Sequence, residues 1–148
     1  MKTIIGTEAD VVKELTALVA DVLARKPEAN IAVSAVDLPA EVLDALAASD
    51  IAFDKATLFQ ACEYCGAAGK GAHAVGAAFS PLMAAKPFAA VHAPDPDTDA
   101  EHAADYDAAI QAAGGLDLVI LGLGERGHVA FNLSLIHISE PTRHLRIS

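Results

Sequence analysis

Residues 116–132 read Leu-Asp-Leu-Val-Ile-Leu-Gly-Leu-Gly-Glu-Arg-Gly-His-Val-Ala-Phe-Asn. The branched apolar run at 118–121 is typical of a buried strand in a parallel sheet. Three glycines follow within six positions, and they allow the backbone to turn sharply and to approach a ligand closely. His128 comes directly after the last of them. Because ligands of open α/β sheets bind at the carboxyl ends of strands, we expect His128 to lie in the functional site.

The rest of the chain alternates between strand and helix patterns. Apolar residues at helical spacing predict an amphipathic helix from about 8 to 25, which begins after a capping box at Thr7. This alternation predicts an α/β fold with a doubly wound, Rossmann-like parallel sheet and flanking helices. The other predicted segments are strands at 30–36, 55–59 and 88–92, a helix that starts with Pro39, a helix over 73–85 broken near Pro81, and a helix over 97–113 that ends at Gly114-Gly115.

Composition limits the classes of function. The 148 residues suit one domain, and 53% hydrophobic residues argue against disorder. A formal net charge of −10 disfavours a nucleic-acid partner. No apolar run reaches the roughly 20 residues of a membrane span, and the first residues lack the apolar core of a signal peptide. With only two cysteines, we expect a cytoplasmic protein without a membrane partner.

The last residues differ in amino-acid composition from the rest of the chain. The segment 133–148 contains neither alanine nor glycine, whereas both are frequent before it. It is similar to translated vector or adapter sequence, so we expect a domain over 1–132 and a non-native tail over 133–148. The alternative is a genuine final strand and turn.

Two short motifs indicate other chemistry. Gly122-x-Gly124-x-x-Gly127 matches the dinucleotide-binding pattern, but too little chain follows for the next strand and helix of that unit. Cys62-x-x-Cys65 could be a redox pair or half of a zinc site completed by His73 or His92. No second such pair is present, so we expect no metal and no cofactor, with a zinc or redox protein as the alternative.

Three longer patterns carry a family resemblance. Residues 121–132 resemble the signature Gly-x-Gly-x-Asp-Gly-His, then Ile-x-Phe-Asn-Glu-Pro, of the glucosamine-6-phosphate deaminase/isomerase family, which includes the 6-phosphogluconolactonases. Residues 93–106 resemble its Ala-Pro-Asp…Asp-Ala-Glu…Tyr segment, and residues 59–64 are similar to its Phe-Asn-x-Asp-Glu-Tyr. The ending Phe-Asn favours the deaminase branch. The resemblance covers about the N-terminal half of a typical member, so we expect a truncated form of the fold.

The resemblance implies an activity. Family members open the ring of an aminosugar phosphate, move a proton between C2 and C1, and release ammonia to give fructose 6-phosphate. A small-molecule sugar phosphate is therefore the expected partner, with assembly as a homo-oligomer. The alternatives are a 6-phosphogluconolactonase-like hydrolase and a non-catalytic sugar-phosphate-binding domain. The residues expected to act are His128, Cys62 and Glu63 in catalysis, and Gly122, Gly124, Arg126 and Gly127 in substrate binding.

Several residues depart from the family pattern. Cys62 stands where the family has its general-base aspartate, and Arg126 replaces the aspartate of the signature. The family's phosphate loop Thr-Gly-Gly-Thr-Pro is replaced by the residues 35–39, which include Asp37. A carboxylate 4 Å from a phosphate charge would cost about 4 kcal/mol at an effective dielectric constant near 20, a roughly thousandfold loss of affinity. We therefore expect weak activity or none.

Overall fold

The computed structural model describes residues 3–64, 75–95, 103–125 and 127–131. Within these residues, four strands form one parallel sheet in the order β3-β2-β1-β4. The strands are β1 (Asn30–Val33), β2 (Thr57–Gln60), β3 (Ala90–His92) and β4 (Leu118–Ile120). The parallel sheet confirms the predicted α/β class.

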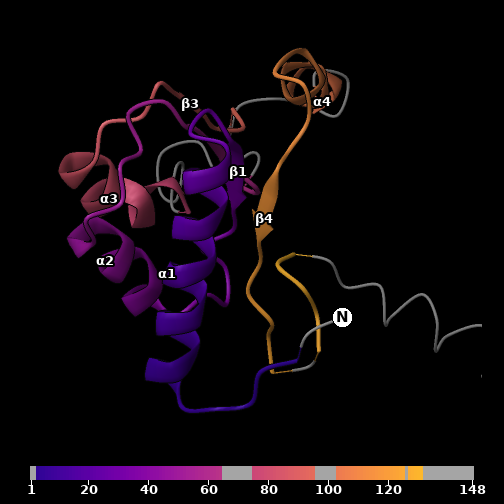
Figure 1. Ribbon diagram of the computed structural model, residues 1–148. Coiled ribbons are helices and arrows are strands. Elements are labelled where there is room, and N and C mark those ends of the chain that lie inside the picture. The colour runs from indigo at the N-terminus through magenta and orange to yellow at the C-terminus, as the bar shows by residue number, and fades with distance from the viewer. Residues whose placement is uncertain (1–2, 65–74, 96–102, 126, 132–148) are drawn as a thin grey trace, which may run out of the picture.

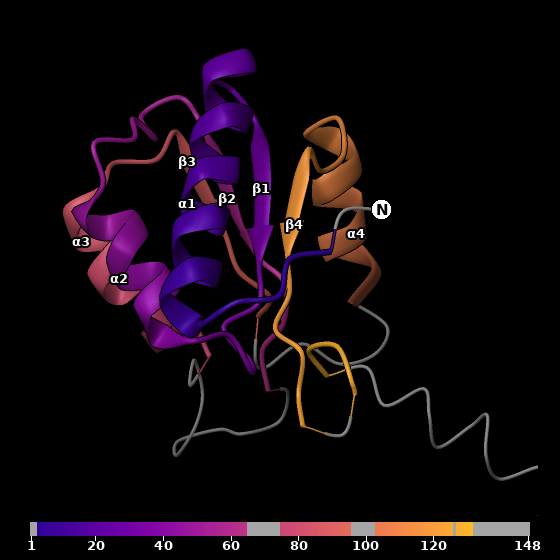
Figure 2. The same cartoon turned by 60° about the horizontal axis from the view of Figure 1, so that its bottom comes forward.

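Helices lie on both faces of this sheet, which makes it doubly wound. On one face lie α1 (Glu8–Arg25), α2 (Ala40–Ala48) and α3 (Ser80–Ala85), with the short 3-10 helix η1 (Gly76–Phe79) leading into α3. On the other face lies α4 (Ala103–Ala112) (Figures 1 and 2). All four strands point toward the end of the sheet at which the loop after β1 and the turn after β4 meet (Figure 2).

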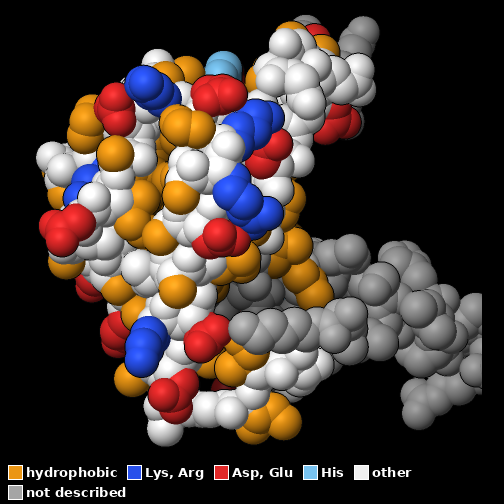
Figure 3. All heavy atoms as spheres, viewed as in Figure 1, with side chains coloured by type: hydrophobic (Ala, Val, Ile, Leu, Met, Phe, Trp, Pro, Cys, Tyr) orange, Lys and Arg blue, Asp and Glu red, His pale blue; other side chains and the backbone are white. Residues whose placement is uncertain are grey.

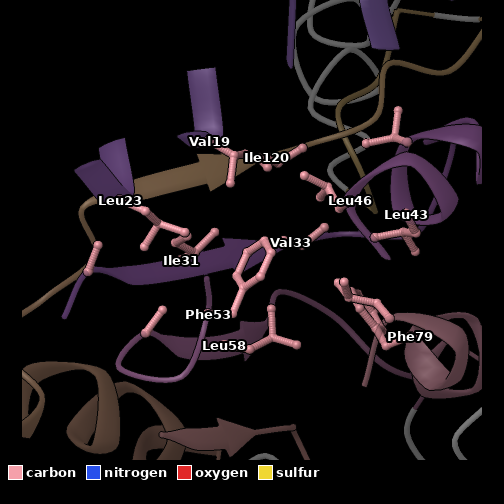
Figure 4. Close-up of a cluster of buried hydrophobic side chains, with 14 of the residues drawn as sticks. Val19, Leu23, Ile31, Val33, Leu43, Leu46, Phe53, Leu58, Phe79 and Ile120 are labelled. Carbon is pink, nitrogen blue, oxygen red and sulfur yellow. The ribbon is translucent and has the colours of Figure 1, made fainter. Parts of the chain in front are cut away.

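The hydrophobic core lies between the sheet and the three helices of the first face. Figure 4 shows its central side chains, which are at most 6% exposed. Burial of each such side chain contributes roughly 1.5–3 kcal/mol. The strands contribute Ile31, Val33, Leu58 and Ile120, and the helices and their connections contribute Val19, Leu23, Val42, Leu43, Leu46, Phe53, Phe79 and Leu82.

The first helix begins and ends as its sequence predicts. The Thr7 hydroxyl accepts a hydrogen bond from Asp10 N (3.3 Å), while the Asp10 carboxylate accepts one from Thr7 N (2.9 Å). These bonds complete the predicted capping box. At the other end, Lys26 Nζ lies 2.8 Å from Asp117, whose carboxylate also accepts from Asn30 N. The bond from Lys26 lowers the pKa of Asp117, and the two contacts join the starts of β1 and β4.

Polar contacts also fix the chain that leads into β4. Gly114 and Gly115 adopt positive φ angles (92° and 86°) and end α4, as predicted. The Asn30 side chain donates to the carbonyls of Ala113 and Gly115, both at 2.8 Å. The end of α4 is thereby held against β1.

Several predicted boundaries were wrong. The strands predicted over 55–59 and 88–92 are Thr57–Gln60 and Ala90–His92. The strand predicted over 30–36 ends at Val33, because the chain turns where the Ser34 hydroxyl accepts from Val36 N. Pro39 caps α2 with an extended ψ of 132° instead of being its first helical residue. Pro81 lies in the first turn of α3 and so begins that helix instead of breaking one, because a missing N–H costs nothing there.

The predicted burial of 118–121 was also partly wrong. Ile120 is 5% exposed, but Val119 and Leu121 are 47% and 44% exposed. Within the described residues, β4 is an edge strand of the sheet (Figures 1 and 2). Figure 3 shows hydrophobic side chains at the surface beside β4 and the segment that follows it. No helix in the described part of the chain is both long and apolar enough to span a bilayer.

Candidate functional site

His128 lies on a short hairpin that follows β4. Leu123 and Val129 form an antiparallel bridge, and Gly124 N donates to the His128 carbonyl at 2.8 Å. Gly127 closes the turn with φ 77° and donates to the Gly124 carbonyl at 2.9 Å. His128 therefore lies on a hydrogen-bonded hairpin at the carboxyl end of β4, where the sequence predicted it.

The imidazole of His128 is paired with a carboxylate from another loop. Its Nε2 lies 2.9 Å from Oδ2 of Asp37, which belongs to the loop after β1. The side chains of His128 and Asp37 are 23% and 37% exposed. The other ring nitrogen, Nδ1, is buried and has no hydrogen-bond partner among the described residues. The loops after β1 and β4 thus meet in a half-buried histidine–carboxylate pair.

Two of the predicted substrate-binding glycines have packing reasons for their identity. A Cβ atom at Gly122 would lie 2.2 Å from the Val36 carbonyl oxygen and 2.3 Å from the Asp37 carbonyl carbon. A Cβ atom at Gly124 would lie 2.2 Å from Cε1 and 2.3 Å from Nε2 of His128. Gly122 lets the Asp37 loop approach β4, and Gly124 leaves room for the imidazole ring.

Cys62 follows β2 and is half-buried. Its sulfur lies 3.2 Å from the hydroxyl oxygen of Ser34, a fully buried residue at the end of β1. Ser34 N in turn donates to the Ile120 carbonyl at 2.9 Å. Cys62 is a free thiol. Its predicted partner Cys65 lies outside the described residues, as does His73.

Glu63 is buried, and both of its carboxylate oxygens accept hydrogen bonds. The donors are the backbone N–H groups of Tyr64 (2.9 Å), Val75 (3.1 Å) and Gly76 (2.9 Å), together with the Gln60 side-chain amide (3.0 Å). Burial alone would raise the pKa of Glu63, but these four bonds together hold it below its ordinary value. The carboxylate is therefore charged at neutral pH, and it joins the end of β2 to the start of η1.

Aromatic contacts complete the surroundings. The rings of Tyr64 and Phe131 lie 4.9 Å apart, so the segment after β2 reaches the hairpin that carries His128. His92 stacks on Phe59 at 4.7 Å. The Tyr106 hydroxyl donates to the carbonyls of Gln60 and His92, and burial raises the pKa of Tyr106 to about 12.

The structure places the predicted residues at one end of the sheet, but no hydrogen bond or ring contact among the described residues joins His128 to Cys62 or Glu63. His128 meets Asp37 directly, and the segment of Cys62 and Glu63 reaches the same end of the sheet through Tyr64. Arg126 lies outside the described residues. From the sequence, Asp37 was expected to repel a phosphate, but it was not identified as the partner of His128. The feature that could have indicated a special role was a carboxylate at a loop position where the family that the sequence resembles has glycine.

The chain is an α/β protein with a parallel, doubly wound sheet. Its His128–Asp37 pair lies at the carboxyl ends of the strands, where α/β proteins of this kind bind their ligands. The family described as glucosamine-6-phosphate isomerases/6-phosphogluconolactonase matches residues 6–135. The chain belongs to this family.

Three relatives carry the name glucosamine-6-phosphate deaminase. The protein of Pseudarthrobacter chlorophenolicus is 34% identical over 138 residues, which are 87% of this chain and 53% of the relative. That of Shewanella loihica is 30% identical over 87% of this chain and 52% of the relative. That of Streptomyces avermitilis is 32% identical over 97% of this chain and 59% of the relative. The chain thus spans about half the length of the relatives it matches.

Proposed function

We propose that this chain provides the histidine-bearing half of a glucosamine-6-phosphate deaminase site, in which His128 exchanges the proton that opens the sugar ring. The proton then moves from C2 to C1 of the opened aminosugar phosphate, which leaves an imine at C2, and water hydrolyses this imine to give fructose 6-phosphate and ammonia. The observation that carries the proposal is the position of His128 at the carboxyl end of β4, beside the loop after β1. The names of the three relatives support the same substrate.

The chemistry suits an imidazole. Ring opening requires a proton to leave one oxygen and another to reach the ring oxygen, and imidazole exchanges protons near neutral pH. His128 is partly exposed, so a ligand can reach its ring, while the hairpin fixes where the ring lies. A fixed ring at the strand ends favours a catalytic role over a purely structural one.

The remaining predicted residues support slow turnover. Cys62 takes the position of the family's general base, and a thiol is a poorer proton acceptor at neutral pH than a carboxylate. Glu63 has both oxygens engaged by donors, which makes it an anchor of the segment after β2 more than a base. We assign Gly122, Gly124, Arg126 and Gly127 to the floor of the substrate site, with Asp37 repelling the phosphate.

The test is the release of ammonia and fructose 6-phosphate from glucosamine 6-phosphate by the 148-residue protein. We expect turnover roughly a thousandfold or more below that of the Pseudarthrobacter chlorophenolicus relative, on the scale of the repulsion by Asp37. His128→Ala should abolish what turnover remains. Turnover equal to the relative's would contradict the proposed weakness. Residual turnover that survives His128→Ala would contradict the role of His128.

We also propose a cytoplasmic location and assembly as a homo-oligomer, with no nucleic-acid partner. The net charge of −10 supports the last point. Sedimentation of the purified protein at several concentrations tests the assembly.

A further inference from the structure

We infer that Asp37 is a positioning residue for the imidazole of His128. It keeps the ring proton on Nε2, so that the ring gains and loses its proton at this nitrogen, which faces Asp37. The inference concerns the resting state of the pair. Only its use in opening a sugar ring rests on the proposed function.

The geometry determines which nitrogen donates. Oδ2 of Asp37 lies 2.9 Å from Nε2, and an ionised carboxylate only accepts hydrogen bonds. Nε2 must therefore carry the proton of this bond. A bond of this kind, to a charged acceptor, is among the stronger ones in proteins.

The other nitrogen supports the same assignment. Nδ1 is buried and has no partner among the described residues. A buried N–H without an acceptor is more costly than a buried lone pair without a donor, so Nδ1 is better left unprotonated. A proton that enters or leaves the ring then does so at Nε2, because Nδ1 is closed to solvent.

The pairing depends on a specific local backbone. Asp37 adopts φ 53°, a left-handed conformation that aspartate tolerates better than most residues. Gly122 leaves room for the Asp37 backbone, and Gly124 leaves room for the ring of His128. Residues from two loops that are 91 positions apart thus converge on one hydrogen bond.

The experiment is nitrogen-15 NMR of the imidazole in the full 148-residue protein without ligand, at a pH where the ring is neutral. The His128 signals are assigned by their loss in His128→Ala. We expect the Nε2–H form and an Nε2 proton that exchanges slowly with water. In Asp37→Gly, which suits the left-handed backbone, this proton should exchange at least about tenfold faster, since the side chain at position 37 then offers it no acceptor.

Two further variants keep the test specific. Asp37→Asn retains an oxygen acceptor and tolerates the same backbone, so it should preserve the slowly exchanging Nε2 proton. Asp44→Asn, on the exposed side of α2, should change nothing. A proton found on Nδ1, or an exchange rate unchanged in Asp37→Gly, would overturn the inference. The NMR experiment contains no substrate, so its outcome does not depend on whether the protein releases ammonia from glucosamine 6-phosphate.

Discussion

Glycine at position 124 is required by the ring that it faces. In Gly124→Ala, the new methyl group would lie 2.2 Å from Cε1 of His128, so the ring must leave Asp37. We expect a loss of about 1–3 kcal/mol in the free energy of unfolding, together with loss of the protected Nε2 proton. Urea denaturation and NMR measure these. Gly114→Ala is the control. It strains a backbone with φ 92°, but its new methyl group would have no atom within 4 Å, so the His128–Asp37 pair should remain.

Glu63 makes a prediction about acid stability at the same scale. Hydrogen bonds hold its pKa in the folded protein below the ordinary value of 4.5 that applies to the unfolded chain. A lowered pKa stabilises the fold above the unfolded pKa, and this stabilisation is lost as the pH falls through the folded pKa.

Glu63→Gln should therefore flatten the acid side of the stability curve. It should also cost about 1–3 kcal/mol at neutral pH, because an amide NH2 would face backbone N–H donors. Denaturation at several pH values measures both effects, and Glu28→Gln, in the exposed turn after α1, is the control. An unchanged acid limb in Glu63→Gln would mean that the four hydrogen bonds do not control this carboxylate.

At the scale of elements, Tyr106 joins α4 to the sheet. Its hydroxyl donates to carbonyls at the ends of β2 and β3, and its ring meets Phe59 edge-on at 6.3 Å. The folded pKa of about 12 lies above the unfolded value of about 10. The contribution of the protonated Tyr106 hydroxyl to the stability of the fold is therefore complete below pH 10 and is lost as the pH rises toward 12.

Tyr106→Phe should remove that alkaline loss and cost about 1 kcal/mol at neutral pH. Chemical denaturation between neutral and alkaline pH provides the measurement. Tyr64→Phe, at a half-exposed ring in the segment after β2, should retain the alkaline dependence. If Tyr106→Phe behaved like the parent protein above pH 10, the hydroxyl would not be linking α4 to the strands.

The elements themselves were largely predictable, but their ends were not. The apolar spacing of α1 and its cap are local features, and both were predicted correctly. The end of β1 was missed because it depends on the hydroxyl of Ser34 turning the chain. Proline was placed in the right segments, but its position within a helix depends on where the first turn forms, and the sequence does not determine this to the residue.

At the scale of the whole molecule, the position of His128 was predictable and its partner was not. A glycine-rich turn after an apolar run places a residue at the end of a strand from local sequence alone. The contact with Asp37 spans 91 positions and requires knowing that β1 and β4 are neighbours in the sheet. The engagement of Glu63 by Val75 and Gly76 is similarly non-local.

The exposed face of β4 makes a prediction about self-association. Val119 is 47% exposed on β4, which is an edge strand among the described residues, and such edges favour pairing with other chains. Val119→Lys should reduce concentration-dependent association in sedimentation velocity, with less than about 0.5 kcal/mol change in stability. Leu18→Lys, equally exposed at 47% but on α1, is the matched control. Equal effects of the two variants would show that β4 is not the associating edge.

The central claim is that His128 meets an aminosugar phosphate, and the most direct test follows its imidazole signals during a titration with glucosamine 6-phosphate. We predict a saturable change in the ring signals that is stronger than with glucosamine or inorganic phosphate alone. In Asp37→Asn, the change should occur at lower concentration, because the repulsion of the phosphate is relieved. Ring signals that stay constant up to saturating glucosamine 6-phosphate in both proteins, or that respond instead only to 6-phosphogluconate, would contradict the account.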